Sequence, residues 1–301
     1  MRDIRTILCP VDRSDISQRA LMAAAALARW HDARVRVMEV VSVLMPAPVV
    51  APDAVKGLTM EMRREVIAEL DRFAQPARVF GVPLHLAVEE GDVVARIVDE
   101  AASLPADLVV LGTHGRSGFE HFALGSVAEK VLRRVKCPVL TVPPGTTVLP
   151  SDRAPFKRIV CAVDFSAASL KGLEYAFSLA QETDAELYAV HVIDWPEDSS
   201  LPEPLAKAIA STRRSWEEEK MRQLRLLVPE SAGTWCRPEP VLLAGSPARE
   251  ILKFAAERRA DLIIMGVHGR GALDLAIFGS TTHTVVREAT CAVLTVRSKG
   301  H

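Results

Sequence analysis

The chain has 301 residues, and its 37 basic and 38 acidic residues leave a formal net charge of −1. This balance supplies no overall positive field for nucleic acid or for an anionic membrane surface, so neither partner is expected. The longest uninterrupted apolar run, 20–28, is much shorter than the ~20 residues of a membrane-spanning helix, so no membrane span is expected. A chain of this length predicts two domains of about 150 residues each.

The N-terminus and the cysteines favour a cytoplasmic location. The first residues, Met1-Arg-Asp-Ile, lack the apolar core of a signal peptide. None of the five cysteines forms a C-x-x-C pair, which favours a reducing compartment. Four of them occupy matching places beside strands in the two halves, where we expect small core residues. These four are Cys9, Cys137, Cys161 and Cys291.

The first half alternates short apolar runs, which predict buried strands, with stretches of three-to-four spacing, which predict helices. Pro10 cannot donate to a strand ladder, so we place it at the carboxyl end of the first strand, where ladder bonds are expected to stop. Ser14 is a favourable N-cap for the helix that follows. The expected strands are 5–12, 34–41, 83–88, 107–111 and 137–142, the expected helices are 18–30, 58–80, 91–102 and 127–135, and 42–53 is a loop.

The second half repeats this order with similar residues at matching places. Asp164 stands 152 residues after Asp12, and Gly266 stands 154 residues after Gly112. The matching segments are 158–164, a cap at Ser166, 183–193, a proline-rich loop at 195–204, a helix through 227, 245–247, 260–264 and 293–296. We interpret the chain as a tandem duplication, with a first domain at 1–143, a linker at 144–156 and a second domain at 157–301. The prolines of the linker predict an extended, semi-rigid connection.

The stretch 112–126 carries the clearest functional signal. It places a glycine, two residues, a second glycine, nine residues and a Gly-Ser pair between an expected strand and an expected helix. A glycine lets the backbone approach a ligand closely because it has no Cβ. A helix N-terminus offers unpaired N–H groups and a partial positive charge, which suit phosphate. The same spacing recurs in 266–280, and turn formation alone does not explain why so long a spacing is repeated.

Alternating strands and helices predict an α/β fold. We expect two tandem doubly wound, Rossmann-like domains, each with a parallel five-stranded sheet of order 3-2-1-4-5 and helices on both faces. In that order strands 1 and 4 are neighbours at the switch point, and ligands bind at the carboxyl ends of the strands there. Asp12 ends the first strand and Gly112 follows the fourth, so both are expected in one crevice. Asp164 and Gly266 form its twin.

On these residues the chain resembles the universal stress protein family in its tandem two-domain form. ATP-binding members of that family carry G-x2-G-x9-G-[ST], which both halves match, so the resemblance implies one ATP site per domain. It also implies a carboxylate contact to adenosine, a backbone contact from the second strand to adenine, lining by the residue before the first glycine, and phosphate contacts from the glycines and the residues after the last one. The implied positions are Asp12, Val40, Leu111, Gly112, Gly115, Gly125, Ser126 and Val127, then Asp164, Val192, Met265, Gly266, Gly269, Gly279, Ser280 and Thr281. Ala162 replaces Pro10 and Thr281 replaces Val127 in the second copy, changes that leave backbone contacts intact.

Charged residues around the glycines have two interpretations each. Arg116 and Arg270 follow the second glycine of each copy and are assigned to phosphate binding, with a solvated surface position as the alternative. Glu120 and Asp274 lie inside the matching loops, where they would hold Mg²⁺ through phosphate and water or remain solvated carboxylates. Solvation is the favoured interpretation for these two carboxylates.

Two further groups are interpreted structurally. His114 and His268 occupy matching loop positions, but no other His, Cys or carboxylate shows metal-ligand spacing with them, so we favour a role in orienting the loop. A basic cluster follows the glycine stretch, and complementing the helix C-terminus is favoured over a docking role. This cluster is Lys130, Arg133, Arg134 and Lys136.

The predicted function is that of an ATP-binding regulator whose nucleotide state changes its shape or its partners. The chain contains neither G-x4-G-K-[ST] nor an obvious general base for hydrolysis, so a dedicated enzyme is not expected. Slow ATP hydrolysis, an enzyme related to the adenine-nucleotide α-hydrolases and a tandem that binds no nucleotide are the alternatives. The fifth strands are expected at sheet edges, where their apolar residues favour pairing of the two domains as an internal pseudo-dimer. The resemblance implies a further homodimer.

Overall fold

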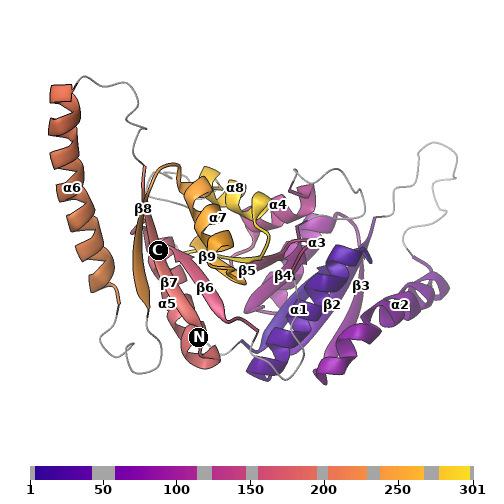
Figure 1. The fold of residues 1–301 in the computed structure, drawn as a ribbon. Coiled ribbons are helices and arrows are strands. Elements are labelled where there is room, and N and C mark those ends of the chain that lie inside the picture. Colours follow the sequence, from indigo (N-terminus) through magenta and orange to yellow (C-terminus); the bar gives the residue numbers. More distant parts are fainter. Residues whose placement is uncertain are drawn as a thin grey trace, which may run out of the picture. The chain divides into compact units, whose positions relative to one another are not determined.

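The computed structural model describes residues 4–42, 58–113, 124–146, 155–194, 203–228, 238–267 and 278–298. The chain divides into two compact units, Arg2–Pro155 and Phe156–His301. Both units alternate strands with helices along the chain, as Figure 1 shows. Within the described residues, every helix is too short or too polar to traverse a bilayer.

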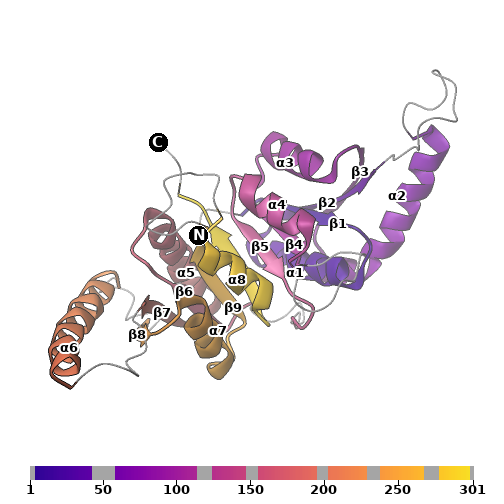
Figure 2. The same ribbon diagram turned by 90° about the horizontal axis from the view of Figure 1, so that it is seen from above.

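The first unit is a parallel sheet covered on both faces. Its strands are β1 (Thr6–Val11), β2 (Arg34–Val41), β3 (Leu84–Glu90), β4 (Leu108–Gly112) and β5 (Val139–Val142). They lie in the order β3-β2-β1-β4-β5, and every described pairing is parallel. The helices are α1 (Asp15–His31), α2 (Met60–Ala74), the 3-10 helix η1 (Gln75–Phe80), α3 (Val93–Ser103) and α4 (Ser126–Arg134). Helices α1 and α2 pack on one face, and α3 and α4 pack together on the other (Figure 2).

The second unit has the same architecture. Its strands are β6 (Arg158–Ala162), β7 (Glu186–Ile193), β8 (Glu239–Ala244), β9 (Leu262–Gly266) and β10 (Ala292–Val296). Its helices are α5 (Ala167–Thr183), α6 (Glu203–Leu226), α7 (Pro247–Glu257) and α8 (Ser280–Glu288). The strand order β8-β7-β6-β9-β10 and the parallel pairings reproduce those of the first unit. The predicted fold, with order 3-2-1-4-5 in each unit, is confirmed.

Matching details extend the duplication to single residues. Gly91 and Gly245, which open the helix after the third strand of each unit, have φ of 127° and 133°, where a side chain would be strained. At the opposite edge, Asp107 accepts a hydrogen bond from the Arg5 amide at 2.9 Å, and Asp261 accepts one from the Lys157 amide at 2.8 Å. Each aspartate therefore links the start of the first strand of its unit to the start of the fourth strand, which lies beside it.

Three local expectations need adjustment. The single helix expected over 58–80 is wrong, because α2 ends at Ala74 and Pro76, which lacks an N–H and would clash with the preceding turn, lies in η1. The sequence predicts a loop at Pro204, yet this residue lies in the first turn of α6, where a missing N–H costs no helix hydrogen bond. Pro10 lies past the register of β1 with β4, which covers Ile7 and Leu8, but the register with β2 continues beyond it.

The cysteines behave as core residues where they are described. Cys9 and Cys161 are fully buried in the first strand of each unit, and Cys291 is buried as well, whereas Cys137 is half-buried. All four are free thiols. Burial raises the pKa of each, to about 12 for Cys137 and Cys291, so none is a thiolate at neutral pH.

Candidate nucleotide site

Each unit has a switch point at the predicted place. β1 lies between β2 and β4 in the first unit, and β6 lies between β7 and β9 in the second. Asp12 follows the end of β1, and Gly112 is the last residue of β4. Because all these strands are parallel, both residues lie at the same edge of the sheet, and Asp164 and Gly266 have the same placement in the second unit. The expected pairs therefore lie at the switch point of each unit, where the fold predicts a ligand crevice.

The aspartate of the first crevice is fixed by the turn that starts α1. Asp12 Oδ1 accepts hydrogen bonds from the Ser14 amide at 3.0 Å and the Ser14 hydroxyl at 2.6 Å. Ser14 in turn caps α1 by accepting from the Ser17 amide at 3.2 Å. The residue between them, Arg13, has a left-handed φ of 63°. A non-glycine residue in this conformation costs about 1–3 kcal/mol, so neighbouring contacts must hold it.

The second crevice repeats this turn. Asp164 Oδ1 accepts from the Ser166 amide at 3.0 Å, and Ser166 caps α5 by accepting from the Ser169 amide at 3.2 Å. Phe165 takes the place of Arg13 and has the same φ of 63°. The turn geometry is therefore kept although the residue at its centre differs.

The two ends of the glycine stretch meet in both units. Gly125 N donates to Thr113 O at 2.8 Å, and Gly279 N donates to Val267 O at 3.1 Å. These bonds place the start of α4 beside the end of β4, and the start of α8 beside the end of β9. Gly125 and Gly279 are the N-cap residues, so no cap side chain covers the first-turn N–H groups. The arrangement leaves each helix N-terminus suited to an anion.

The remaining expected positions lie around these ends. Ser126 and Ser280 are exposed at the first helical position, and Leu111 and Met265 are buried at the ends of their strands. Among the others, Val40, Val192 and Thr281 are half-buried, and Val127 is exposed. The binding roles of all the expected positions remain predictions, and several of these residues lie outside the described residues. They are His114, Gly115, Arg116, Glu120, His268, Gly269, Arg270 and Asp274.

Gly266 has a packing role that the sequence did not reveal. A Cβ at this position would lie 2.9 Å from Ala168 Cβ and 2.9 Å from Ser169 N, in the first turn of α5. Separations this short do not occur between real Cβ atoms and their neighbours. The missing side chain therefore lets β9 lie close to α5, in addition to any role at a ligand. Thr282 Oγ1 donates to Gly266 O at 2.9 Å and ties α8 to the same point.

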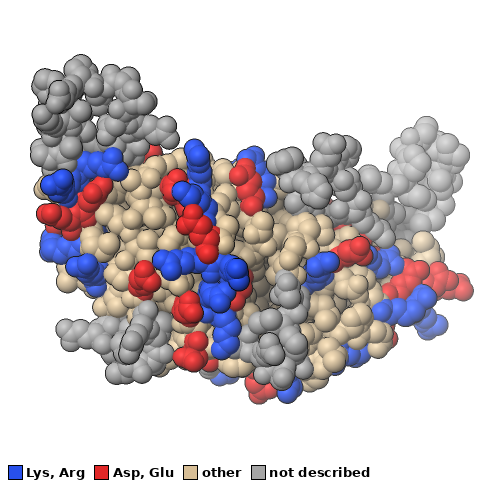
Figure 3. Space-filling model, viewed as in Figure 1, with Lys and Arg blue, Asp and Glu red and all other residues tan. Residues whose placement is uncertain are grey.

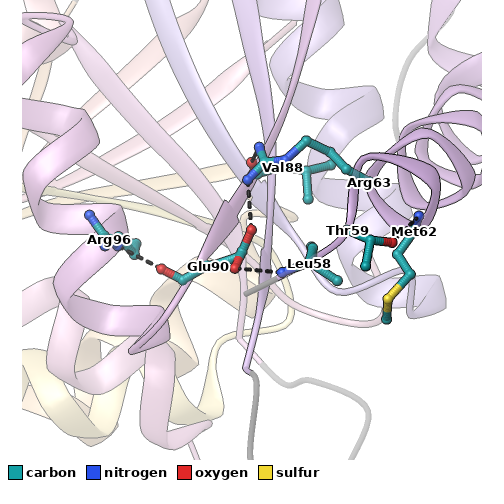
Figure 4. A network of polar contacts seen from close by, with 7 residues as sticks. All are labelled: Leu58, Thr59, Met62, Arg63, Val88, Glu90 and Arg96. Carbon is teal, nitrogen blue, oxygen red and sulfur yellow. Dashed lines mark hydrogen bonds and ion pairs between the residues drawn. The ribbon is translucent and has the colours of Figure 1, made fainter. Parts of the chain in front are cut away.

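A polar network at the end of β3 fixes the start of α2 (Figure 4). Glu90 Oε2 accepts from the Leu58 amide at 2.9 Å, and Glu90 Oε1 accepts from Arg63 Nη2 at 2.7 Å. Arg63 Nη1 also donates to Val88 O at 2.8 Å, while Arg96 Nε donates to Glu90 O at 2.8 Å. Sequence reasoning missed this network, since its charges come from three separate elements.

The charges elsewhere do not single out another site. On the face shown in Figure 3, basic and acidic side chains are interspersed rather than gathered by sign. Arg133 and Arg134 lie in the last turn of α4, where they complement the helix C-terminus, and Arg133 pairs with Glu129 at 2.8 Å. The described residues contain no group of three or more His, Cys, Asp or Glu placed to hold a metal ion.

Comparisons with known proteins point to one family in both units. The model of the universal stress protein family matches residues 3–143 and again 155–297. A universal stress protein of Mycolicibacterium smegmatis is 27% identical over 303 residues, which cover 97% of each chain. One from Methanocaldococcus jannaschii is 34% identical over 143 residues, which cover 47% of this chain and 82% of that protein. The crystal structure of a universal stress protein from Archaeoglobus fulgidus superposes with a TM-score of 0.70 at 24% identity, covering 98% of this chain and 97% of the other.

Proposed function

The chain belongs to the universal stress protein family, with one match to the family in each half, and from this premise we propose that it is a regulator that binds one ATP in each unit. The observation that carries the proposal is the repeated arrangement at the two switch points. In both units a fixed aspartate at the end of the first strand faces the same sheet edge as a helix N-terminus, which is tied to the end of the fourth strand. A carboxylate suits ribose hydroxyls, and a helix N-terminus suits phosphate.

The nucleotide would lie along the carboxyl edge of the sheet. Asp12 would contact the ribose and the Val40 backbone the adenine, while Leu111 would line the base. Gly112, Gly115, Gly125, Ser126 and Val127 would hold the phosphates, with Arg116 reaching a phosphate oxygen. In the second unit the corresponding residues are Asp164, Val192, Met265, Gly266, Gly269, Arg270, Gly279, Ser280 and Thr281. Any Mg²⁺ would be held mainly by the nucleotide's own phosphate oxygens and water.

The output we propose is a change of shape or partners rather than a chemical product. Backbone N–H groups would bind the phosphates of ATP, and this binding requires no catalytic base. Sustained ATP turnover in a steady-state assay would contradict this part and favour a hydrolase. We place the protein in the cytoplasm, a proposal that the free thiols support.

We further propose that the fifth strands of the two units pair about a pseudo-two-fold axis, and that two chains then associate. The sequence supports this through the apolar residues of the expected edge strands, β5 and β10. A crystal structure showing both edges in water would overturn the internal pairing, and a monomer by light scattering would overturn the dimer.

Calorimetric titration of ATP into Asp12→Ala and Asp164→Ala tests the proposed site. Removing a carboxylate that binds a ligand hydroxyl costs roughly 1–3 kcal/mol, so each change should weaken its own site roughly 5- to 150-fold. Asp15→Ala is the matched control, because Asp15 is an exposed carboxylate in the first turn of α1, three residues away. ATP binding by the double variant that equals wild type, with the control also unchanged, would refute the proposed site.

A further inference from the structure

The residue at the centre of each aspartate turn makes contacts that differ between the units. In the first unit Arg13 Nη2 forms an ion pair with Glu39 Oε1 at 2.9 Å, and Arg13 Nη1 pairs with Glu69. The Glu39 side chain is only 7% exposed. A carboxylate this deeply buried is costly unless it is paired, so Arg13 is needed where it stands.

This ionic link joins three elements beside the proposed adenosine end. Arg13 follows β1, Glu39 belongs to β2 and Glu69 belongs to α2. Glu39 lies opposite Val11 in the β1–β2 register. Asp12 follows Val11 and Val40 follows Glu39, and both are proposed nucleotide contacts. The ionic link therefore fixes the carboxyl ends of β1 and β2, the two strand ends that would hold adenosine and that we call the rim.

The second unit makes the same connection with aromatic groups. The Phe165 ring lies 4.7 Å from the His191 ring, and Lys220 Nζ lies 5.0 Å from the centre of the Phe165 ring. His191 Nδ1 is 2.6 Å from Val163 O, just after the end of β6. His191 stands 152 residues after Glu39, and Lys220 lies on α6 as Glu69 lies on α2. Arg13 and Phe165, and Glu39 and His191, therefore stand at matching positions, and Lys220 lies on the helix that corresponds to α2. The chemistry has changed from ionic to aromatic and cation–π.

We propose that Arg13 with Glu39, and Phe165 with His191, are positioning residues for adenosine, and that the two crevices hold the same rim by different interactions. The proposal rests on the proposed ATP binding and adds which residues shape each site. The left-handed turn supports it, because Arg13 and Phe165 are held in a costly conformation by these contacts. Each set of residues works as a unit, so exchanging a whole set preserves the rim whereas changing one member does not.

The test uses the full chain with Asp164→Ala and Gly279→Val, so that titration reports the first crevice. Adding Arg13→Met should lower the affinity for ATP about five- to tenfold, because the variant loses a hydrogen-bonded charge that orders the site. Inorganic tripolyphosphate, measured by competition with ATP, should keep its affinity, because it uses only the phosphate end. A general loss of structure would weaken both ligands.

The decisive part of the test exchanges the whole set of residues in the first unit for the set of the second unit. Arg13→Phe and Glu39→His install the ring pair of the second unit, and Glu69→Lys adds a cation, because Glu69 contacts residue 13 as Lys220 contacts Phe165. This triple variant should bind ATP within about twofold of the parent. Should Arg13→Met fail to fold in a thermal melt, Arg13→Lys replaces it, since a single ammonium cannot reproduce the fork to two carboxylates. The inference on the positioning residues is overturned, without affecting the proposed function, if the Arg13 variant binds ATP as tightly as the parent. It is also overturned if the triple variant binds ATP as weakly as the Arg13 variant. A folded wild-type protein that binds no ATP overturns both this inference and the proposed function.

Discussion

Replacing Gly266 by alanine tests whether the end of β9 is held against α5 as closely as the structure indicates. The added Cβ would lie 2.9 Å from Ala168 Cβ and Ser169 N and 3.0 Å from Ala168 C. Favourable contacts between carbon atoms lie near 3.5–4.0 Å, so the new methyl group would be roughly 0.5–1 Å too close. Two of the three atoms are backbone, so no change of rotamer relieves the overlap. Overpacking of this kind costs about 1–3 kcal/mol.

Thermal unfolding of the ligand-free protein, followed by circular dichroism, measures the effect. Since 1 kcal/mol shifts the melting temperature of a domain this size by about 2–4 °C, Gly266→Ala should melt roughly 2–12 °C below wild type. Gly172→Ala is the matched control in the same α5–β9 interface, where the added Cβ would meet Ile264 Cγ2 at 3.5 Å. That distance is ordinary contact, and alanine favours a helix over glycine by about 1 kcal/mol, so the control should melt at or above wild type. Equal melting temperatures for the two variants would refute the reasoning.

Three further predictions concern the described contacts. Glu90→Ala should speed hydrogen exchange at the Leu58 amide several-fold, because it removes the acceptor 2.9 Å away; unchanged exchange would mean that this bond does not hold the start of α2. Cys9 and Cys161 should resist iodoacetamide at pH 8 until the protein unfolds, since both are fully buried and burial raises the pKa of each thiol; rapid labelling of the native protein would contradict this. Burial raises the pKa of the Asp261 carboxyl above its usual 3.8, so this group stabilises the folded state most at low pH, where it is protonated. The free energy of unfolding of wild type relative to Asp261→Asn, measured by urea titration, should therefore fall as pH rises through the acidic range. A relative free energy that rises with pH would contradict this prediction.

Most of the fold follows from the sequence because the pattern is stated twice. A single apolar run is compatible with a strand or with a buried helix. Two such runs at the same offset, with the same neighbouring residues, indicate a strand in both halves. The strand order then places Asp12 beside Gly112, although the two are far apart in the chain. The approach of Gly125 to Thr113 at 2.8 Å agrees with a glycine stretch that starts and ends at one point.

What the sequence did not predict depends on packing between elements. The pairing of Arg13 with Glu39 requires the strand register and the left-handed turn, neither of which is written in residue spacing. The packing reason for Gly266 requires the distance between β9 and α5. The helix expected over 58–80 ends early because Pro76 cannot donate the backbone hydrogen bond that a continuing helix needs, a local effect that the three-to-four spacing does not express.

The stoichiometry of ATP binding tests the central claim most directly. Each unit has its own aspartate, glycine stretch and helix N-terminus, so calorimetric titration of nucleotide-free protein should give two ATP per chain. Gly125→Val and Gly279→Val should each leave one, because a branched side chain crowds the close backbone approach to phosphate in its own crevice. A stoichiometry of zero for wild type, or loss of all binding from Gly125→Val alone, would contradict a chain with two independent nucleotide sites.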